Sequence, residues 1–135
     1  MKYDVAIIGA GPGGIFSACE LTKLAPSLRV AVFEAGHSLE KRHCPIDGKK
    51  VKSCIGCKSC SIMSGFGGAG AFSDGKYNIT NDFGGTLYEY IGKQQALDLM
   101  HYVDEINMLY GGEGTRLYST AGSVSYTHLR AHETL

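Results

Sequence analysis

The first thirty-four residues alternate apolar runs and a glycine-rich turn in the order strand, turn, helix, strand. Residues 3–8 are continuously apolar from Val5 and rich in β-branched side chains, which is typical of a strand buried on both faces of a parallel sheet. Residues 9–14 interrupt this run with glycines, apolar residues at helical spacing follow, and residues 29–33 form a second β-type run. This order predicts one βαβ unit and therefore an α/β, Rossmann-like fold.

The next part of the chain shows little periodicity. Residues 36–62 combine Gly, Lys, Cys and Ser without a clear apolar pattern, which predicts a long irregular segment. Such segments in compact domains are usually functional or disordered. Residues 72–80 are expected to form a short hairpin that turns at Asp74-Gly75.

Two helices are expected after the hairpin. The first is short and covers residues 85–91. The second covers residues 93–110 and is followed by two glycines that would end it. Its apolar face is expected to consist of Ala96, Leu99, Met100, Val103, Ile106, Leu109 and Tyr110.

The glycine turn has the composition of a dinucleotide-binding site. Gly9 allows a tight turn out of the strand, Gly11 lets the backbone approach a pyrophosphate, and Gly14 lets the helix pack closely on the sheet. The free N–H groups and the positive dipole end of the helix would face the phosphates. Glu34, at the end of the second strand, would accept hydrogen bonds from the ribose hydroxyls and oppose a 2′-phosphate. The residues expected to contact the cofactor here are Gly9, Gly11, Pro12, Gly13, Gly14, Glu34 and Ala35.

FAD and NAD use the same turn and the same acidic residue, so the motif alone does not distinguish them. The run from Asp4 to Gly14, together with Phe33-Glu34-Ala35-Gly36, resembles the two-dinucleotide-binding flavoprotein superfamily. In that superfamily the first such unit holds FAD, so the resemblance favours FAD, and an NAD-binding dehydrogenase is the alternative.

A second glycine-rich run covers residues 64–76. It resembles the GGAG-x-FSDGK segment of a family of FAD-dependent dehydrogenases related to NAD(FAD)-utilising oxidoreductases, and the resemblance covers residues 1 to about 120. Its glycines allow positive φ angles and close backbone approach to a flat ring or a phosphate. Lys76 or backbone amides near a flavin would stabilise its reduced form. A glycine turn that only supports a hairpin is the alternative. The residues expected to bind the cofactor here are Gly67, Gly68, Ala69 and Gly70.

Four cysteines lie close together in the irregular segment. They are Cys44, Cys54, Cys57 and Cys60, in the spacing C-x9-C-x2-C-x2-C. A CxxC turn brings two thiolates to one ion, so the spacing suits an iron–sulfur cluster or zinc. A dithiol that exchanges electrons with the flavin and four reduced cysteines in a flexible loop remain alternatives.

Composition narrows the class of protein. The 13 basic and 13 acidic residues balance, which argues against a nucleic-acid binder that depends on phosphate contacts. No run of about 18 apolar residues is present, so a membrane span is not expected. The remaining pattern is typical of an intracellular α/β protein, and a cytoplasmic location is expected.

The last residues of the chain have a different character. The stretch from Val124 to Thr134 resembles a translated transposase-type sequencing adapter, because one reading frame of that oligonucleotide spells these residues in order. We therefore expect residues 1–122 to be the N-terminal part of an FAD/NAD(P)-binding domain and residues 123–135 to be a non-native tail.

Taken together, these patterns predict the FAD-binding part of a flavin-dependent oxidoreductase whose substrate and electron partner are unknown. A non-enzymatic metal-binding or redox-sensing module built on the cysteines is the competing hypothesis. No catalytic acid or base can be assigned from the sequence. The three histidines before the tail, His37, His43 and His101, are expected to be solvated or structural.

Overall fold

The computed structural model describes residues 1–73, 77–82, 84–112, 116–119 and 128–131. The chain divides into two compact units, Met1–Ser73 and Asp74–Leu135. Each unit has its own secondary structure, and each is described by itself below.

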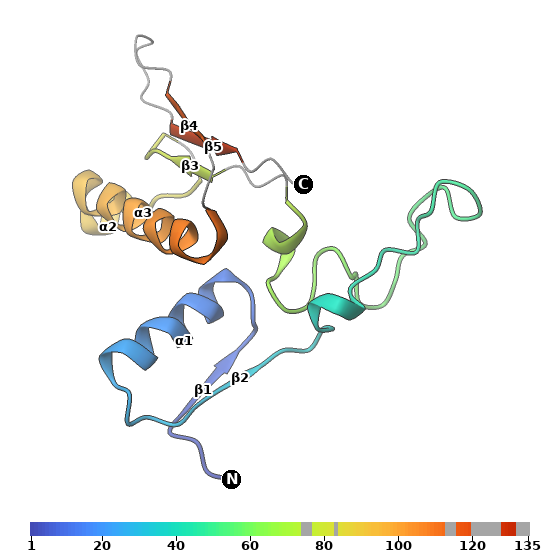
Figure 1. Ribbon diagram of the computed structural model, residues 1–135, viewed down its shortest axis with the longest axis horizontal. Coiled ribbons are helices and arrows are strands. Elements are labelled where there is room, and N and C mark those ends of the chain that lie inside the picture. Colours follow the sequence, from blue (N-terminus) through green and yellow to red (C-terminus); the bar gives the residue numbers. More distant parts are fainter. Residues whose placement is uncertain (74–76, 83, 113–115, 120–127, 132–135) are drawn as a thin grey trace. The chain divides into compact units, whose positions relative to one another are not determined.

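The first unit begins with the predicted βαβ arrangement (Figure 1). Strand β1 (Val5–Ile8) leads into helix α1 (Pro12–Leu24), and strand β2 (Val30–Phe33) follows. The two strands are parallel, with Val5 paired to Val30 and Ile8 paired to Phe33. The α/β class and the Rossmann-like βαβ unit are therefore confirmed.

An exposed ion pair aligns the two strands where they begin. The Arg29 guanidinium donates from Nε to Oδ2 of Asp4 and from Nη2 to Oδ1 of Asp4, each at 2.9 Å. The backbone N–H of Arg29 also donates to Asp4 Oδ2, and the N–H of Asp4 donates to the Arg29 carbonyl. Because the pair is exposed, it contributes little to stability, and it lies where the two strands begin.

Helix α1 packs on one face of the two strands, and a missing side chain makes the close approach possible. Ile7 points toward the helix, and a Cβ atom added to Gly14 would lie 3.3 Å from Ile7 Cγ2. The same Cβ atom would overlap the carbonyl oxygen of Gly9. Gly14 therefore has the role expected from the sequence, which is to let the helix lie against the turn.

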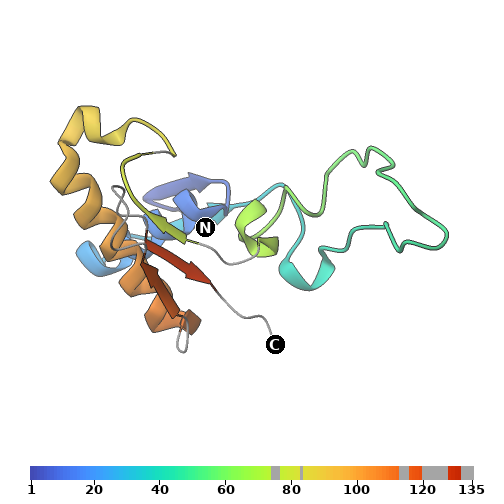
Figure 2. The ribbon, with the colours of Figure 1, turned by 90° about the horizontal axis from the view of Figure 1, so that it is seen from above.

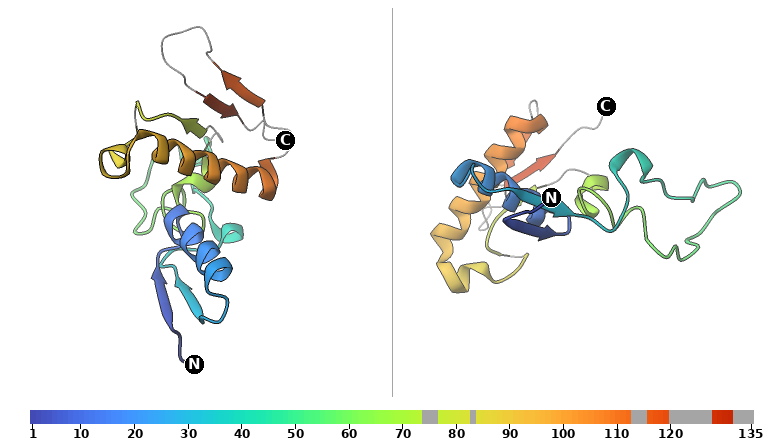
Figure 3. Two further views of the ribbon diagram at one scale, coloured as in Figure 1. Left: turned by 90° about the vertical axis from the view of Figure 1, so that its left-hand side faces the viewer. Right: turned by 90° about the horizontal axis from the view of Figure 1, so that it is seen from below.

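The opposite face of β1 and β2 is open, which corrects one expectation. Ile8 is 83% exposed and Phe33 is 51% exposed. The apolar run of β1 predicted burial on both faces, but within the first unit α1 covers one face only (Figure 3). The apolar pattern shows that both faces of the strand could be buried. Whether both are buried depends on how many elements the rest of the chain packs against the sheet.

The segment from Glu34 to Ser73, all of which the structure describes, is largely irregular, as predicted. Its regular elements are two short 3-10 helices, η1 (Leu39–Lys41) and η2 (Ala69–Phe72). Between them the chain makes a long loop over residues 43–60 that extends away from β1, α1 and β2 (Figures 1 and 2). We call residues 43–60 the cysteine loop, because it contains the four clustered cysteines.

The second unit contains two helices and a small antiparallel sheet. Its elements are β3 (Tyr77–Ile79), α2 (Leu87–Ile91), α3 (Lys93–Asn107), the π-helical turn η3 (Met108–Gly112), β4 (Arg116–Ser119) and β5 (His128–Ala131). The strand order is β3-β5-β4. Both predicted helices are confirmed, although α3 ends at residue 107 rather than 110.

The predicted apolar face of α3 is only partly buried. Ala96 is buried, and Met100, Val103 and Ile106 are half-buried. Leu99, Leu109 and Tyr110 are exposed, which corrects their assignment. The last two lie in η3, where Tyr110 and Gly111 leave helical φ/ψ values and turn the chain out of the helical register.

A polar residue takes part in the buried side of α3. Asp104 is buried, and its charge together with burial raises the pKa of Tyr77, with burial the larger cause. The Tyr77 hydroxyl donates to the carbonyl oxygen of Met100 at 3.2 Å. These contacts join β3 to α3 through polar groups that the apolar pattern does not reveal.

The expected hairpin at residues 72–80 is not formed as predicted. Phe72 ends η2 rather than a strand, and β3 pairs with β5 instead of with a neighbouring segment. Asp74 and Gly75, the expected turn, lie outside the described residues. Strand β5 comes from the tail interpreted as adapter-derived. Strands pair through main-chain hydrogen bonds, which any sequence can form, so the pairing of β5 does not show whether the tail is native. The origin of the tail therefore stays a prediction.

None of the helices in the described ranges has both the length and the apolar character needed to cross a bilayer.

The contact between α1 and the turn can be tested with two alanine variants. Gly14→Ala should lower the free energy of unfolding by about 1–3 kcal/mol, because the new Cβ atom would overlap the Gly9 carbonyl oxygen. Gly13→Ala is the matched control, because a Cβ atom there meets nothing within 4 Å and alanine favours helix by up to about 1 kcal/mol. Urea unfolding of the whole chain measures both, and equal midpoints would contradict the close approach of α1.

Candidate functional site

The turn between β1 and α1 presents backbone without side chains. Gly9 has φ +97°, a conformation that favours glycine, and its N–H donates to the Phe33 carbonyl at 2.7 Å. A Cβ atom added at Gly11 or Gly13 would meet nothing within 4 Å. The predicted approach path for a ligand is therefore open at both positions.

The start of α1 offers an electrostatic site for an anion. Gly11 is the residue before the first helical turn, and no side chain caps the helix there. Pro12 opens the helix, and the first turn contains no acidic residue. The first N–H groups of a helix lack partners within the helix and carry the positive end of its dipole, so they attract a negatively charged group.

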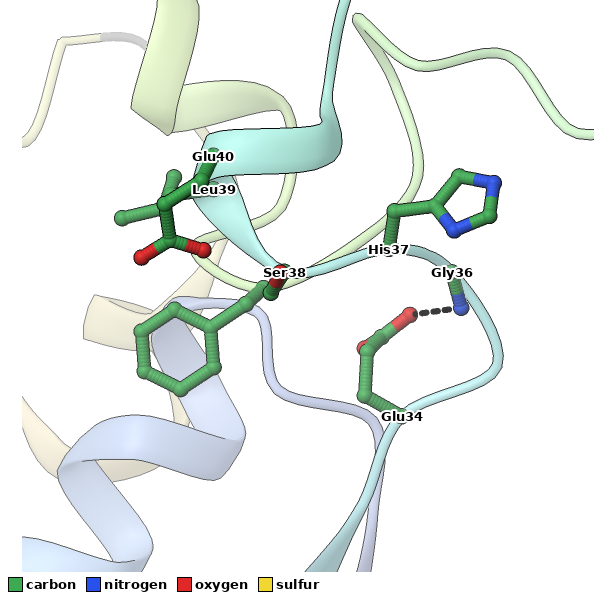
Figure 4. Close-up of a pocket in the computed structure, with 7 residues that line it drawn as sticks. Glu34, Gly36, His37, Ser38, Leu39 and Glu40 are labelled. Carbon is green, nitrogen blue, oxygen red and sulfur yellow. Dashed lines mark hydrogen bonds between the residues drawn. The ribbon is translucent and has the colours of Figure 1, made fainter.

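The Glu34 carboxylate joins the glycine turn to the segment after β2, and Figure 4 shows its bond to Gly36. Its Oε2 accepts a hydrogen bond from the N–H of Ala10 at 2.7 Å, and its Oε1 accepts one from the N–H of Gly36 at 2.8 Å. These two bonds, with smaller contributions from the Ala35 amide and the charge of Arg42, hold the pKa of Glu34 below its ordinary range. The side chain is therefore a fixed carboxylate, and each oxygen has a further lone pair for a ligand hydroxyl.

The second glycine run lies against the first. The N–H of Gly67 donates to the Ala10 carbonyl at 2.8 Å. A Cβ atom on Gly68 would lie 3.2 Å from both Gly11 Cα and Pro12 Cδ. Gly67 and Gly68 have φ values of +86° and +62°, which favour glycine. The structure thus joins two motifs that are more than fifty residues apart in the sequence.

The remaining residues predicted from the second run are less closely placed. Ala69 and Gly70 belong to η2 and are exposed, and a Cβ atom on Gly70 would lie 3.9 Å from Pro12 Cγ. Lys76, which was expected near a flavin, lies outside the described residues.

An open pocket of about 280 Å³ lies beside Glu34 (Figure 4). Its volume is near the lower end of the range for small-molecule sites, which begins at roughly 300 Å³. Leu39 and Phe66 contribute apolar surface, whereas Glu34 and Glu40 contribute carboxylates. The lining residues are Glu34, Gly36, His37, Ser38, Leu39, Glu40 and Phe66.

Sequence reasoning missed Arg42, which is the largest fully buried side chain among the described residues and is only 1% exposed. Its guanidinium donates four hydrogen bonds to main-chain carbonyls and lies 4.7 Å from the centroid of the Phe72 ring. The chain around it is lysine-rich and without periodicity, so no pattern distinguished this arginine from a solvated one.

The four clustered cysteines are exposed, and none of them forms a disulfide with another described residue. Within the described part of the chain, which includes the whole cysteine loop, no group of three or more His, Cys, Asp or Glu residues is placed to hold a metal ion. Metal or redox chemistry at Cys44, Cys54, Cys57 and Cys60 therefore stays a prediction. Cys19 is half-buried in α1.

The three histidines before residue 123 are all exposed, namely His37, His43 and His101. His37 borders the pocket beside Glu34, and its carbonyl accepts a hydrogen bond from the Phe66 N–H at 3.0 Å. Its contribution to this region is therefore a main-chain contact.

Comparison with known proteins gives one partial similarity. Over 76 residues, which are 56% of this chain, the sequence is 36% identical to a protein of Clostridium beijerinckii described as uncharacterized. The similar region is only 14% of the length of that protein. No protein-family model matches the chain, and no solved structure matches it.

The bonds to Glu34 predict a pH dependence. A carboxyl group whose pKa is lowered by folding stabilises the folded state above its unfolded pKa, and this contribution is lost as the pH falls through the folded value. Glu34→Gln should therefore unfold at lower urea concentration than the unmodified chain at pH 7, because the amide nitrogen of glutamine cannot accept the second N–H. The difference should shrink below about pH 4. A difference that stays constant from pH 7 to pH 3 would contradict the assignment.

Proposed function

We propose that the chain binds the ADP portion of FAD and is the cofactor-binding part of a flavin-dependent oxidoreductase. The observation that carries this proposal is the meeting of the two glycine runs at the start of α1. There bare backbone faces open space, and the Glu34 carboxylate is held at the edge of the same turn.

A diphosphate is the ligand that best suits the turn. The open space at Gly11 and Gly13 leaves room for a group that contacts the backbone directly. The amide dipoles of α1 favour negative charge, and the first helical turn has no carboxylate to repel it. The diphosphate would therefore lie against the backbone of residues 11–14, held by N–H groups.

The attached adenosine would extend toward β2. Glu34 is deprotonated at neutral pH and already fixed by two N–H groups, so it can accept hydrogen bonds from ribose hydroxyls without reorganising. Its charge disfavours a 2′-phosphate. The pocket beside it, with Leu39 and Phe66 in its lining, suits a flat apolar base.

The choice of FAD rather than NAD rests on sequence. The first glycine turn resembles that of flavoproteins whose N-terminal unit holds FAD, and the second run resembles a segment of FAD-dependent dehydrogenases. When bound, FAD would supply two-electron redox chemistry. The residues of this chain would bind and orient it. The donor and acceptor of electrons are expected to depend on other parts of the protein, for which no residue here is assigned.

A panel of ligands tests the proposal on the whole chain. FAD and ADP should both bind, because both carry the adenosine diphosphate group, whereas FMN should bind at least tenfold more weakly because it lacks the adenosine. NADP should bind more weakly than NAD because of the charge of Glu34. Quenching of flavin fluorescence measures FAD and FMN, and calorimetry measures the other ligands. Failure of both FAD and ADP to bind at millimolar concentration would refute the proposal.

A single methyl group tests the position of the diphosphate. Gly11→Ala should weaken FAD and ADP at least tenfold, because its Cβ atom would occupy the space proposed for the phosphates. The same Cβ atom meets no atom of the protein within 4 Å, and the φ of −76° suits alanine, so the fold should be kept. The urea midpoint controls for stability. Unchanged affinity in a folded Gly11→Ala variant would place the ligand elsewhere.

A further inference from the structure

We propose that Arg42 is the positioning residue of the dinucleotide site, and that it fixes the second glycine run against the first without touching the ligand. The inference rests on the proposed function. It assigns a role to a buried cation that the glycine motifs do not predict.

The Arg42 guanidinium donates all of its described hydrogen bonds to main-chain carbonyls. Nε donates to the Ser61 carbonyl at 2.8 Å, and Nη2 donates to the Ile62 carbonyl at 2.8 Å. Nη1 donates to the carbonyls of Phe66 at 2.6 Å and Gly68 at 2.8 Å. A buried charge is costly unless its donors are satisfied, and here four carbonyl oxygens satisfy them. Lysine has a single ammonium group and cannot reproduce this planar arrangement.

The first pair of bonds closes the cysteine loop. Arg42 directly precedes the loop, and Ser61 and Ile62 directly follow it. Bringing the ends of a long loop together has an entropic cost, which these two bonds offset. The chain therefore enters the second glycine run from a fixed point, whatever conformation the cysteine loop adopts.

The second pair of bonds orients individual peptide groups. In a trans peptide the C=O and the following N–H point in opposite directions. The Phe66 carbonyl accepts from Arg42, and the N–H of the same peptide group, that of Gly67, donates to the Ala10 carbonyl. Arg42 and the first glycine turn thus hold this peptide group from its two sides.

The next bond acts in the same way. The Gly68 carbonyl accepts from Arg42, so the N–H of Ala69 points to the opposite side, at the start of η2. Ala69 is one of the residues predicted to contact the cofactor. The positive charge of Arg42 also helps to hold the pKa of Glu34 below its ordinary range. Arg42 therefore acts electrostatically on the proposed ribose contact.

The test compares two arginines in the same chain. Arg42→Lys should weaken FAD at least tenfold, because one ammonium group cannot hold four carbonyls. Arg29→Lys is the matched control, because the Arg29 guanidinium forms the exposed pair with Asp4. This substitution should leave FAD affinity unchanged. Amide hydrogen exchange should become faster at residues 65–69 in Arg42→Lys and stay unchanged in β1 and α1.

A second variant adds chemical rescue. Arg42→Ala should also bind FAD weakly, and millimolar guanidinium should restore part of the affinity by occupying the vacated space, whereas equal concentrations of sodium chloride should not. Equal FAD affinity in Arg42→Lys and the unmodified chain would overturn the role of Arg42. Loss of exchange protection throughout β1 and α1 would also overturn it, because Arg42 would then support the whole unit. If the unmodified chain binds neither FAD nor ADP, the proposed function fails first.

Discussion

The first unit depends on one residue, Ala10, whose main-chain groups are bonded on both sides. Its N–H donates to Glu34 and its carbonyl accepts from Gly67, at 2.7 and 2.8 Å. Ala10 is only 1% exposed, so neither polar group could be left without a partner at low cost. These two bonds join the end of β1, the end of β2 and the second glycine run at one point.

The arrangement explains why the candidate site consists mainly of backbone. Amide groups form the surface proposed for the diphosphate, and the glycines keep that surface open. Charged side chains act from beside or beneath it: Glu34 accepts N–H groups at its edge, and Arg42 holds carbonyls behind it. In the proposed complex the opposite charges have complementary roles, because the carboxylate would accept from the ribose and the cation would fix the amide groups.

The cysteine loop and the second unit have features of their own. The cysteine loop begins directly after Arg42, and Arg42 donates to the Ser61 and Ile62 carbonyls at its other end. The second unit has its own buried contacts, centred on Ala96 and Ile79, and its helix α3 carries a buried Asp104 beside Tyr77. Neither observation assigns a reaction to the chain. The site near Ala10 is therefore the part of the molecule that supports a functional proposal.

Local physics was enough to predict β1, α1, β2 and the two later helices from the sequence. These elements depend on signals that act over a few neighbouring residues and can therefore be read from the sequence. The signals are apolar periodicity, the Gly9–Gly14 turn and the glycines after residue 110. The role of Gly14 was predictable for the same reason, because the turn it packs against is five residues away. The position of Glu34 followed from the known length of a βαβ unit.

Tertiary structure decided the rest, because the contacts involved join distant segments. The pairing of Gly67 with Ala10, the burial of Arg42 and the pairing of β3 with β5 leave no periodic signal. One face of β1 is open and Leu99 is exposed. Burial at both places depends on which other elements pack there, and an apolar pattern does not contain that information. The sequence by itself determined β1, α1, β2, α2, α3 and the close approach of α1 at Gly14, because these depend on neighbouring residues. Only the folded chain determined which carbonyls a buried guanidinium could reach, because those carbonyls come from a distant segment.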